Sequence, residues 1–302
     1  MKTLYADRSE AGNVRYVNDV VYDDTKGMPL HLQLLYPKIP AELAEIRAAE
    51  REGRAVRELP ETARKLSARN MPCVVYVQGS AWGKQDVHGS LPLLIDIARL
   101  GFVVASVEYR PVTVTPFPGF IQDVKAAIRF LKANADLYGI DPARIAVWGC
   151  SSGGHTSLMV GSTGWTSEFD DERYADQDSK VAACVAYYGV AEFTPFLAGG
   201  PFARPYLFDH ILGKEGAKDP GNVARMSPVT YIKPDQDYPP FLLIHGDMDP
   251  VVPFEQSEFM NQKLTDCGKQ VEFYKVFGAG HGSGFWTPEV LEVTGRFLKA
   301  YV

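Results

Sequence analysis

The sequence predicts an α/β protein in which helices cover both faces of a mostly parallel, eight-stranded sheet. Apolar runs rich in β-branched residues alternate along the chain with segments of helical spacing, and this alternation is typical of parallel sheets. One apolar run ends in Gly149-x-Ser151-x-Gly153, which indicates a strand, a tight turn and the start of a helix. With 302 residues and 46% hydrophobic content, the chain can fill one large core, and we expect a single domain over residues 1–302.

The predicted strands are short apolar runs bounded by glycine, proline or polar turn residues. The first two alternate apolar and polar residues, which favours an antiparallel pair at one edge, whereas the others resemble buried parallel strands. In chain order, we expect strands at Val14–Tyr22, Leu30–Tyr36, Pro72–Gln78, Phe102–Glu108, Ile145–Cys150, Val181–Tyr188, Phe241–His245 and Val271–Phe277.

Helices are predicted where apolar residues recur at helical spacing between those strands. These segments are Leu91–Leu100, Phe120–Leu137, Gly153–Gly161, Phe254–Asp266 and Thr287–Val302. Gly101 and Gly139 are suited to end two of these helices, because glycine adopts the left-handed conformation of a C-terminal cap without steric cost.

Two segments exceed the length of ordinary connections. Residues 38–70 are rich in Ala, Glu and Arg and are predicted to form a helical insertion, either a solvated surface excursion or a flap or subunit contact. Residues 190–238 follow the sixth strand and are predicted to form a cap. Their aromatic side chains are expected partly to bind substrate and partly to pack the cap onto the core.

Ser151 stands at the apex of the strand-turn-helix motif, between glycines that leave room for so sharp a turn. A serine hydroxyl needs an adjacent base and an orienting acid to act as a nucleophile near neutral pH. His281 is the predicted base, because it lies in a glycine-dense loop after the last strand, where α/β sheets carry catalytic residues. Asp249, after the seventh strand, is the predicted acid, while Asp247 is expected to bond the backbone of the turn.

Attack on an ester carbonyl also requires N–H groups that stabilise the oxyanion. The third predicted strand opens into Gly79-Ser80-Ala81-Trp82, small residues that allow the backbone to approach a substrate. The N–H of Ser152, the residue after the nucleophile, is expected to complete this oxyanion hole.

Together these motifs resemble the α/β-hydrolases of the esterase/lipase group, nearest to the branch of acetylxylan and feruloyl esterases and of carboxylesterases related to hormone-sensitive lipase. The triad order Ser151, Asp249, His281 is the one found in that superfamily. The resemblance runs from about Leu30 to the C-terminus and also rests on Val107-Glu108-Tyr109-Arg110, on Gln122–Arg129 and on Tyr138–Ile145.

The chain departs from the family at the oxyanion loop. Where the family has His-Gly-Gly-Gly-Trp, this chain has Gln78-Gly79-Ser80-Ala81-Trp82, so Cβ atoms replace two glycines and the histidine that braces the loop is missing. Gln78 could partly substitute for that histidine. Matching positions assigns the oxyanion donors to Ser80, Ala81 and Ser152.

The resemblance implies a serine hydrolase that cleaves short-acyl carboxylic esters, with carbohydrate-linked acetyl or feruloyl esters as the leading candidates. The expected substrate contacts are Trp82, Phe193, Phe196 and Tyr206. An amide-directed serine hydrolase of the arylformamidase or peptidase type is the alternative, and a catalytically silent hydrolase-fold binding protein is a weaker one. No metal or organic cofactor is implied, since the triad needs none.

Composition restricts the partners. A net charge of −6 without a lysine or arginine block argues against nucleic acid, and no stretch approaches the roughly 18 apolar residues of a membrane span. The N-terminus lacks the apolar core of a signal peptide, so we expect a cytoplasmic protein. The expected partner is a small-molecule ester, with an acylated sugar among the candidates, and a homo-oligomer stays open.

The four scattered cysteines form neither a disulfide framework nor a zinc pattern, and Cys150 is expected to be a packed thiol.

Overall fold

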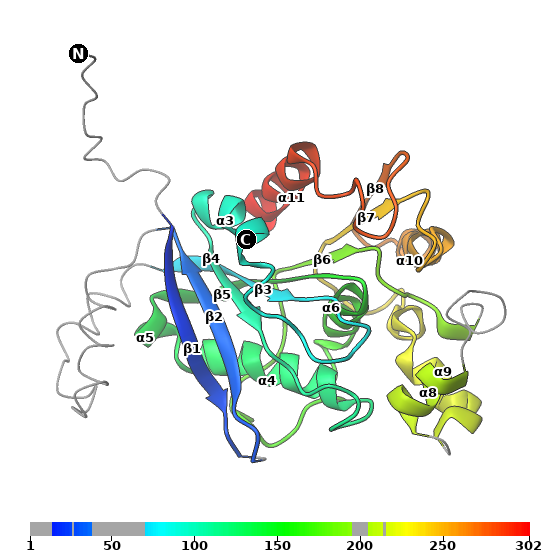
Figure 1. Cartoon of the computed structure of the whole chain (residues 1–302), viewed down its shortest axis with the longest axis horizontal. Helices are drawn as coiled ribbons and strands as arrows, with labels where there is room; N and C mark the ends of the chain where they lie inside the picture. The colour runs from blue at the N-terminus through cyan, green and yellow to red at the C-terminus, as the bar shows by residue number, and fades with distance from the viewer. Residues whose placement is uncertain (1–13, 26, 38–69, 195–204, 214–215) are drawn as a thin grey trace.

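The computed structural model describes residues 14–25, 27–37, 70–194, 205–213 and 216–302, which contain a single eight-stranded sheet (Figure 1). Its strands lie in the order β1-β2-β4-β3-β5-β6-β7-β8. β1 pairs antiparallel with β2 and β2 antiparallel with β4, while every later pair is parallel, which confirms the predicted fold class. The strands are β1 (Arg15–Asp23), β2 (Leu30–Tyr36), β3 (Met71–Val77), β4 (Val103–Val107), β5 (Ile140–Cys150), β6 (Ala183–Tyr187), β7 (Phe241–Gly246) and β8 (Val271–Val276).

Each predicted strand is present, and the largest differences concern β1 and β5. β1 does not keep a strict alternation, because its register with β2 shifts between Val17 and Val20, where Asp19 has a φ of 52°. β5 begins at Ile140 rather than Ile145. Its polar first half is held by Asp141, whose carboxylate accepts hydrogen bonds from the Ala143 amide and the Arg144 side chain.

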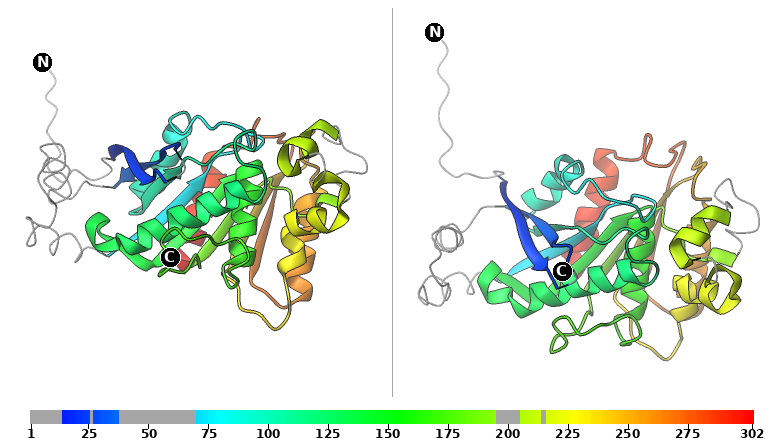
Figure 2. Two further views of the ribbon diagram at one scale, coloured as in Figure 1. Left: turned by 90° about the horizontal axis from the view of Figure 1, so that it is seen from below. Right: turned by 60° about the horizontal axis from the view of Figure 1, so that its bottom comes forward.

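Helices cover both faces of the sheet (Figures 1 and 2). Alternate residues of β3 point to opposite sides: Cys73, Val75 and Val77 belong to one hydrophobic core, and Val74 and Tyr76 belong to the other. The first core is closed by α4 (Gly119–Ala133), α6 (Ser152–Thr163) and α10 (Glu255–Asp266), and the second by α3 (Leu91–Arg99) and α11 (Pro288–Tyr301).

The helix predicted over Phe120–Leu137 is in fact two helices. α4 ends at Ala133, and the short α5 (Ala135–Tyr138) follows a break at Asn134, whose φ is −114°. The Asn134 side chain donates to the carbonyl oxygen of Phe130 at 2.9 Å and so competes with the helical backbone. Gly139 ends α5 in the left-handed conformation with a φ of 63°, as predicted.

The segment between β6 and β7 contains short helices that the sequence pattern did not resolve. They are α8 (Pro205–Leu212), η2 (Gly216–Lys218), α9 (Pro220–Met226) and η3 (Pro228–Tyr231). In both figures these helices lie at the end of the molecule opposite β1. The predicted insertion over residues 38–70 lies outside the described residues, apart from Asn70, as do residues 195–204 and 214–215 of the cap.

A network of buried charges ties the antiparallel edge to α4. Arg173 contacts the carboxylates of Asp23, Asp123 and Asp171 at 2.5, 2.9 and 2.6 Å, and all four side chains are at most 6% exposed. Arg110 forms a further pair with Asp123 at 2.5 Å. Carboxylates this deeply buried are stable in their charged form only while their partners remain in place.

We therefore expect Arg173→Met to lower the free energy of unfolding by about 3–5 kcal/mol, because it leaves buried carboxylates without their main partner. Urea denaturation followed by circular dichroism measures this change. Arg99→Met is the control, since Arg99 and its partner Asp96 are both more than half exposed, and a change of at most about 1 kcal/mol is expected there. Equal effects from the two substitutions would contradict a stabilising role for the buried network.

Candidate active site

Ser151 lies on a turn that only its neighbouring glycines permit. Its φ and ψ are 55° and −124°, a strained conformation for a residue with a side chain. A Cβ at Gly149 would lie 2.3 Å from the carbonyl oxygen of Gly153, and one at Gly153 would lie 1.9 Å from that of Val77. The Ser151 amide donates to the carbonyl oxygen of Tyr187 at 2.9 Å. The turn therefore holds the Ser151 backbone between β3 and β6.

The three side chains predicted to form a triad lie in one hydrogen-bonded chain. His281 Nε2 lies 2.8 Å from Ser151 Oγ, and His281 Nδ1 lies 2.7 Å from Asp249 Oδ2. With its proton on Nδ1, the imidazole donates to the carboxylate and accepts the serine hydroxyl. Ser151 follows β5, while Asp249 and His281 lie in the loops after β7 and β8, so the carboxyl ends of three strands bring them together.

The side chain of Asp249 is buried and held by several donors. Its Oδ1 accepts the amides of Val251 and Val252 at 2.7 and 2.9 Å, and its Oδ2 faces His281 and, at 3.3 Å, His245. Burial favours the neutral acid, but the hydrogen bonds from both histidines and both amides outweigh it and hold the pKa of Asp249 well below its ordinary value. The carboxylate beside His281 is thus charged.

His245 and Asp247 complete the acid segment. The sequence pattern indicated a packed strand-end residue at His245, and its ring is indeed buried between the Ser257 hydroxyl at 2.7 Å and the Val252 carbonyl oxygen at 3.0 Å. The pattern did not reveal that the same ring reaches the Asp249 carboxylate. Asp247 was expected to bond the backbone of its own turn, whereas its carboxylate accepts the Gly278 amide, in the loop after β8, at 2.6 Å.

The loop after β3 forms a tight turn through two non-glycine residues. The Gly83 amide donates to the Ser80 carbonyl oxygen at 2.9 Å, and the two central residues, Ala81 and Trp82, have φ values of 50° and 58°. This is a type I′ turn, which normally selects glycine or asparagine because side chains are strained at positive φ. Gly79 is required for a different reason, since a Cβ there would lie 2.5 Å from the Cys150 carbonyl oxygen.

The predicted oxyanion donors are not equivalent. The Ser80 amide already donates to Ser152 Oγ at 2.9 Å, so this predicted donor is engaged within the loop. The Ser152 amide is the first N–H of α6, and such groups have no acceptor within their own helix. With the Ser80 amide engaged, the amides of Ala81 and Ser152 remain as the candidate donors to an oxyanion beside Ser151.

Tyr109, rather than Gln78, braces this loop. The Tyr109 hydroxyl donates to the Gln78 carbonyl oxygen at 3.1 Å and lies 2.9 Å from the Ser80 hydroxyl, which also lies 2.8 Å from the carbonyl oxygen of Gly83. The side-chain oxygen of Gln78 is buried and has no hydrogen-bond partner among the described residues. The Gln78 side-chain oxygen therefore does not brace the loop in this structure.

The predicted substrate contacts that the structure describes are buried. Trp82 is 4% exposed and Phe193 is 0% exposed, and their ring centroids lie 5.9 Å apart in the core. Both rings therefore pack within the core of this structure, and the expectation that they contact substrate stays a prediction. Phe196 and the Tyr206 side chain lie outside the described residues.

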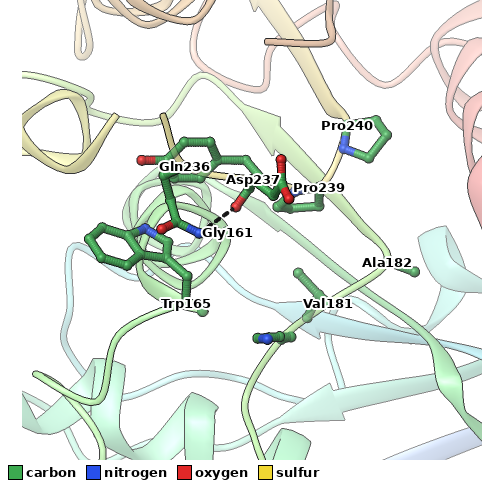
Figure 3. A pocket seen from close by; sticks show the side chains of 11 residues that line it. Gly161, Trp165, Val181, Ala182, Gln236, Asp237, Pro239 and Pro240 are labelled. Carbon is green, nitrogen blue, oxygen red and sulfur yellow. Dashed lines mark hydrogen bonds between the residues drawn. The ribbon is translucent and has the colours of Figure 1, made fainter. Parts of the chain in front are cut away.

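The hollow drawn in Figure 3 lies at the amino ends of the strands, away from the triad. It measures about 450 Å³ and is lined by residues that precede β6 and β7, with Trp165, Val181, Ala182, Gln236 and Pro240 among them. Because the triad lies beyond the other ends of these strands, this hollow is not part of its site. Within the described part of the chain, no cluster of three or more His, Cys, Asp or Glu side chains could hold a metal ion.

Comparisons with known proteins find a matching family and relatives that are named as esterases. The BD-FAE family model matches residues 62–264. Among curated proteins, esterase LipC of Mycobacterium tuberculosis is 33% identical over 72% of this chain and 54% of its own length, and the probable carboxylic ester hydrolase LipM of the same organism is 32% identical over 67% and 47%. The chain spans about half the length of the curated relatives it matches. No described helix is long and apolar enough to cross a bilayer.

Solved structures of proteins named as carbohydrate esterases or GH43-CE proteins have a similar fold over nearly the whole chain. A truncated carbohydrate esterase from gut microbiota superposes with a TM-score of 0.77 at 25% identity, covering 95% of this chain and 96% of that one. A bifunctional GH43-CE protein of Bacteroides eggerthii also has a TM-score of 0.77, at 26% identity, and covers 98% of this chain and 39% of that one.

The burial of the cysteines predicts an order of thiol reactivity. Cys73, Cys150 and Cys184 are buried, and burial raises the pKa of each thiol, whereas Cys267 is partly exposed. We expect iodoacetamide at pH 8 to modify Cys267 first and to spare the other three, as peptide mass spectrometry would show. Denatured protein, in which all four react, is the control. Alkylation of Cys150 as fast as Cys267 would mean an accessible thiol beside Ser151.

Proposed function

The chain belongs to the BD-FAE family, within the esterase and lipase group of the α/β-hydrolases, and we propose that it is a serine carboxylesterase. One observation carries the proposal: a strained serine, an imidazole and a buried carboxylate lie in one hydrogen-bonded chain with distances of 2.8 and 2.7 Å. This arrangement activates a hydroxyl for attack on an acyl carbon.

The proposed reaction has two steps. Ser151 Oγ attacks the ester carbonyl carbon while its proton passes to His281 Nε2, and the oxyanion is stabilised by the amides of Ala81 and Ser152. When the tetrahedral intermediate collapses, His281 returns the proton to the leaving alcohol and an acyl-enzyme remains. Water then attacks the acyl-enzyme, His281 accepts its proton, and the acid is released as Ser151 regains its hydrogen. Asp249 stays ionised throughout and stabilises the imidazolium that forms twice in the cycle.

We propose short-acyl esters of carbohydrates, acetyl or feruloyl, as the substrate class. The support comes from the two structural neighbours described above, which are named a carbohydrate esterase and a GH43-CE protein, and from the acetylxylan and feruloyl esterase resemblance of the motifs. The small acyl groups would lie against Ser151, and the sugar would supply the alcohol that leaves first.

Hydrolysis of p-nitrophenyl esters from acetate to octanoate tests the esterase proposal. We expect acetate and butyrate to be turned over fastest, and Ser151→Ala to lose a factor of about 10⁴–10⁶ in kcat because the nucleophile is gone. p-Nitroacetanilide, the amide with the same acyl group, is the control for bond type and should react far more slowly. Faster cleavage of the anilide than of the acetate would replace the esterase proposal with an amidase.

Substitution of Asp249, the proposed orienting acid, can be compared with substitution of Asp247, which lies two residues earlier in the chain. Asp249→Asn should lower kcat/KM by about 10³–10⁴, because a neutral amide neither fixes the imidazole tautomer nor stabilises the imidazolium. Asp247→Asn should change it by no more than about threefold, since the Asp247 contacts seen among the described residues are with the loop backbone and a nearby lysine. Similar losses from both substitutions would argue against the assignment of Asp249.

The carbohydrate part of the proposal needs its own comparison. Acetate release from an acetylated xylo-oligosaccharide is measured beside release from ethyl acetate, which has the same acyl group but no sugar. We expect kcat/KM to be at least about tenfold higher for the sugar ester, equivalent to roughly 1.4 kcal/mol of binding to the sugar. Equal values would leave a general short-chain esterase.

A further inference from the structure

One buried histidine connects the oxyanion turn to the cap. His155 lies on α6 in the first turn after Ser151 and is 0% exposed. Its Nδ1 accepts the indole N–H of Trp82 at 3.2 Å, and its Nε2 donates to the carbonyl oxygen of Met226, the last residue of α9, at 2.8 Å. Both ring nitrogens are therefore occupied, one by each neighbour. The triad does not use this histidine.

On the side of the oxyanion turn, His155 bonds Trp82, whose backbone is strained. Ala81 and Trp82 both have positive φ, which costs about 1–2 kcal/mol for each residue with a side chain. Such conformations persist only where the surroundings enforce them. Tyr109 and the Ser80 hydroxyl hold the first half of the turn. The second half is held by the Val112 amide, which donates to the Trp82 carbonyl oxygen at 2.9 Å, and by the indole.

Three aromatic rings surround His155 and restrict its imidazole. Its centroid lies 5.1, 5.4 and 5.9 Å from those of Phe193, Trp82 and Phe120, and the first two contacts are edge-to-face. Burial lowers the pKa of His155 to about 4, so the ring is neutral at pH 7 and Nδ1 is free to accept the indole N–H. A neutral ring with its proton on Nε2 satisfies both hydrogen bonds at once.

From this geometry we propose that His155 is a positioning residue, which holds the Ser80–Gly83 turn in its strained shape and couples that turn to the cap. The direction of the Ala81 amide depends on the dihedrals of this turn, so a change at His155 would misalign an oxyanion donor without touching the substrate. The inference rests on the proposed function, because it gives the turn its role in catalysis.

Variants that remove both hydrogen bonds of His155, or only the bond from the indole, test this coupling. His155→Leu removes both bonds, and Trp82→Phe keeps an aromatic ring but removes the indole N–H. We expect each to lower kcat for p-nitrophenyl acetate by about 10- to 100-fold, less than the loss of an oxyanion donor itself, with KM within about twofold of the original value. The double variant should lose no more than about threefold beyond either single one, because both changes break the same contact.

A conservative variant and a remote control separate positioning from general damage. His155→Gln offers both an acceptor and a donor, so kcat should stay within about fivefold of the original. Trp165→Phe removes an indole hydrogen bond to the Ser162 carbonyl oxygen, 2.7 Å long and far from the triad, and should leave kcat unchanged. Losses that multiply in the double variant, or a His155→Leu protein with the original kcat, would overturn the proposal.

Hydrogen exchange distinguishes this inference from the esterase proposal. We expect the amides of residues 80–83 to exchange about tenfold faster in His155→Leu than in the unchanged protein or in Trp165→Phe, as mass spectrometry of the corresponding peptide would show. This readout does not depend on turnover. If no ester is hydrolysed but the exchange changes as expected, the proposed function fails and the coupling stands. If esters are hydrolysed and exchange at 80–83 is unchanged, the coupling fails.

Discussion

The site depends on how closely the first turn of α6 approaches the end of β3. A Cβ at Gly153 would lie 1.9 Å from the Val77 carbonyl oxygen, so the contact exists only because glycine has no side chain. This contact sets Ser151 beside the loop that follows β3, and the bond from the Ser80 amide to Ser152 Oγ crosses the same gap. Because β3 and β5 are neighbouring parallel strands, their carboxyl ends place the Ser80–Gly83 turn and Ser151 at the same end of the sheet.

The remaining parts of the site provide hydrogen bonds to polar groups that are buried away from water. A carboxylate withdrawn from water is stable only when hydrogen bonds replace its hydration, and Asp249 receives them from two backbone amides and two imidazoles. These donors also restrict its orientation, so the carboxylate can orient His281 without reorganising. Tyr109 and His155 act similarly on the other side of Ser151, where buried polar groups fix a loop that carries little regular structure.

Much of this architecture could be predicted from the sequence, because its signals are local. Apolar runs mark the eight strands, and the glycines around Ser151 and His281 mark where the chain turns. The break at Asn134 was missed because helical spacing continues across it. Tyr109, His155 and His245 were not assigned these contacts, since their partners lie far away in the sequence or on other elements. The buried positions of Trp82 and Phe193 were also missed, because nothing local indicates that a non-glycine turn directs a side chain into the core.

The order of the strands also affects how the site forms during synthesis. Ser151 and His281 are 130 residues apart, and the histidine follows β8, the strand at the far edge of the sheet. A growing chain therefore carries its serine through the synthesis of α6, β6, the cap and β7 before the imidazole emerges. Since domains fold as units, a chain that ends before β8 lacks the imidazole that the proposed triad needs. Under the proposed mechanism, Ser151 therefore gains its base only after almost all of the described fold has been synthesised.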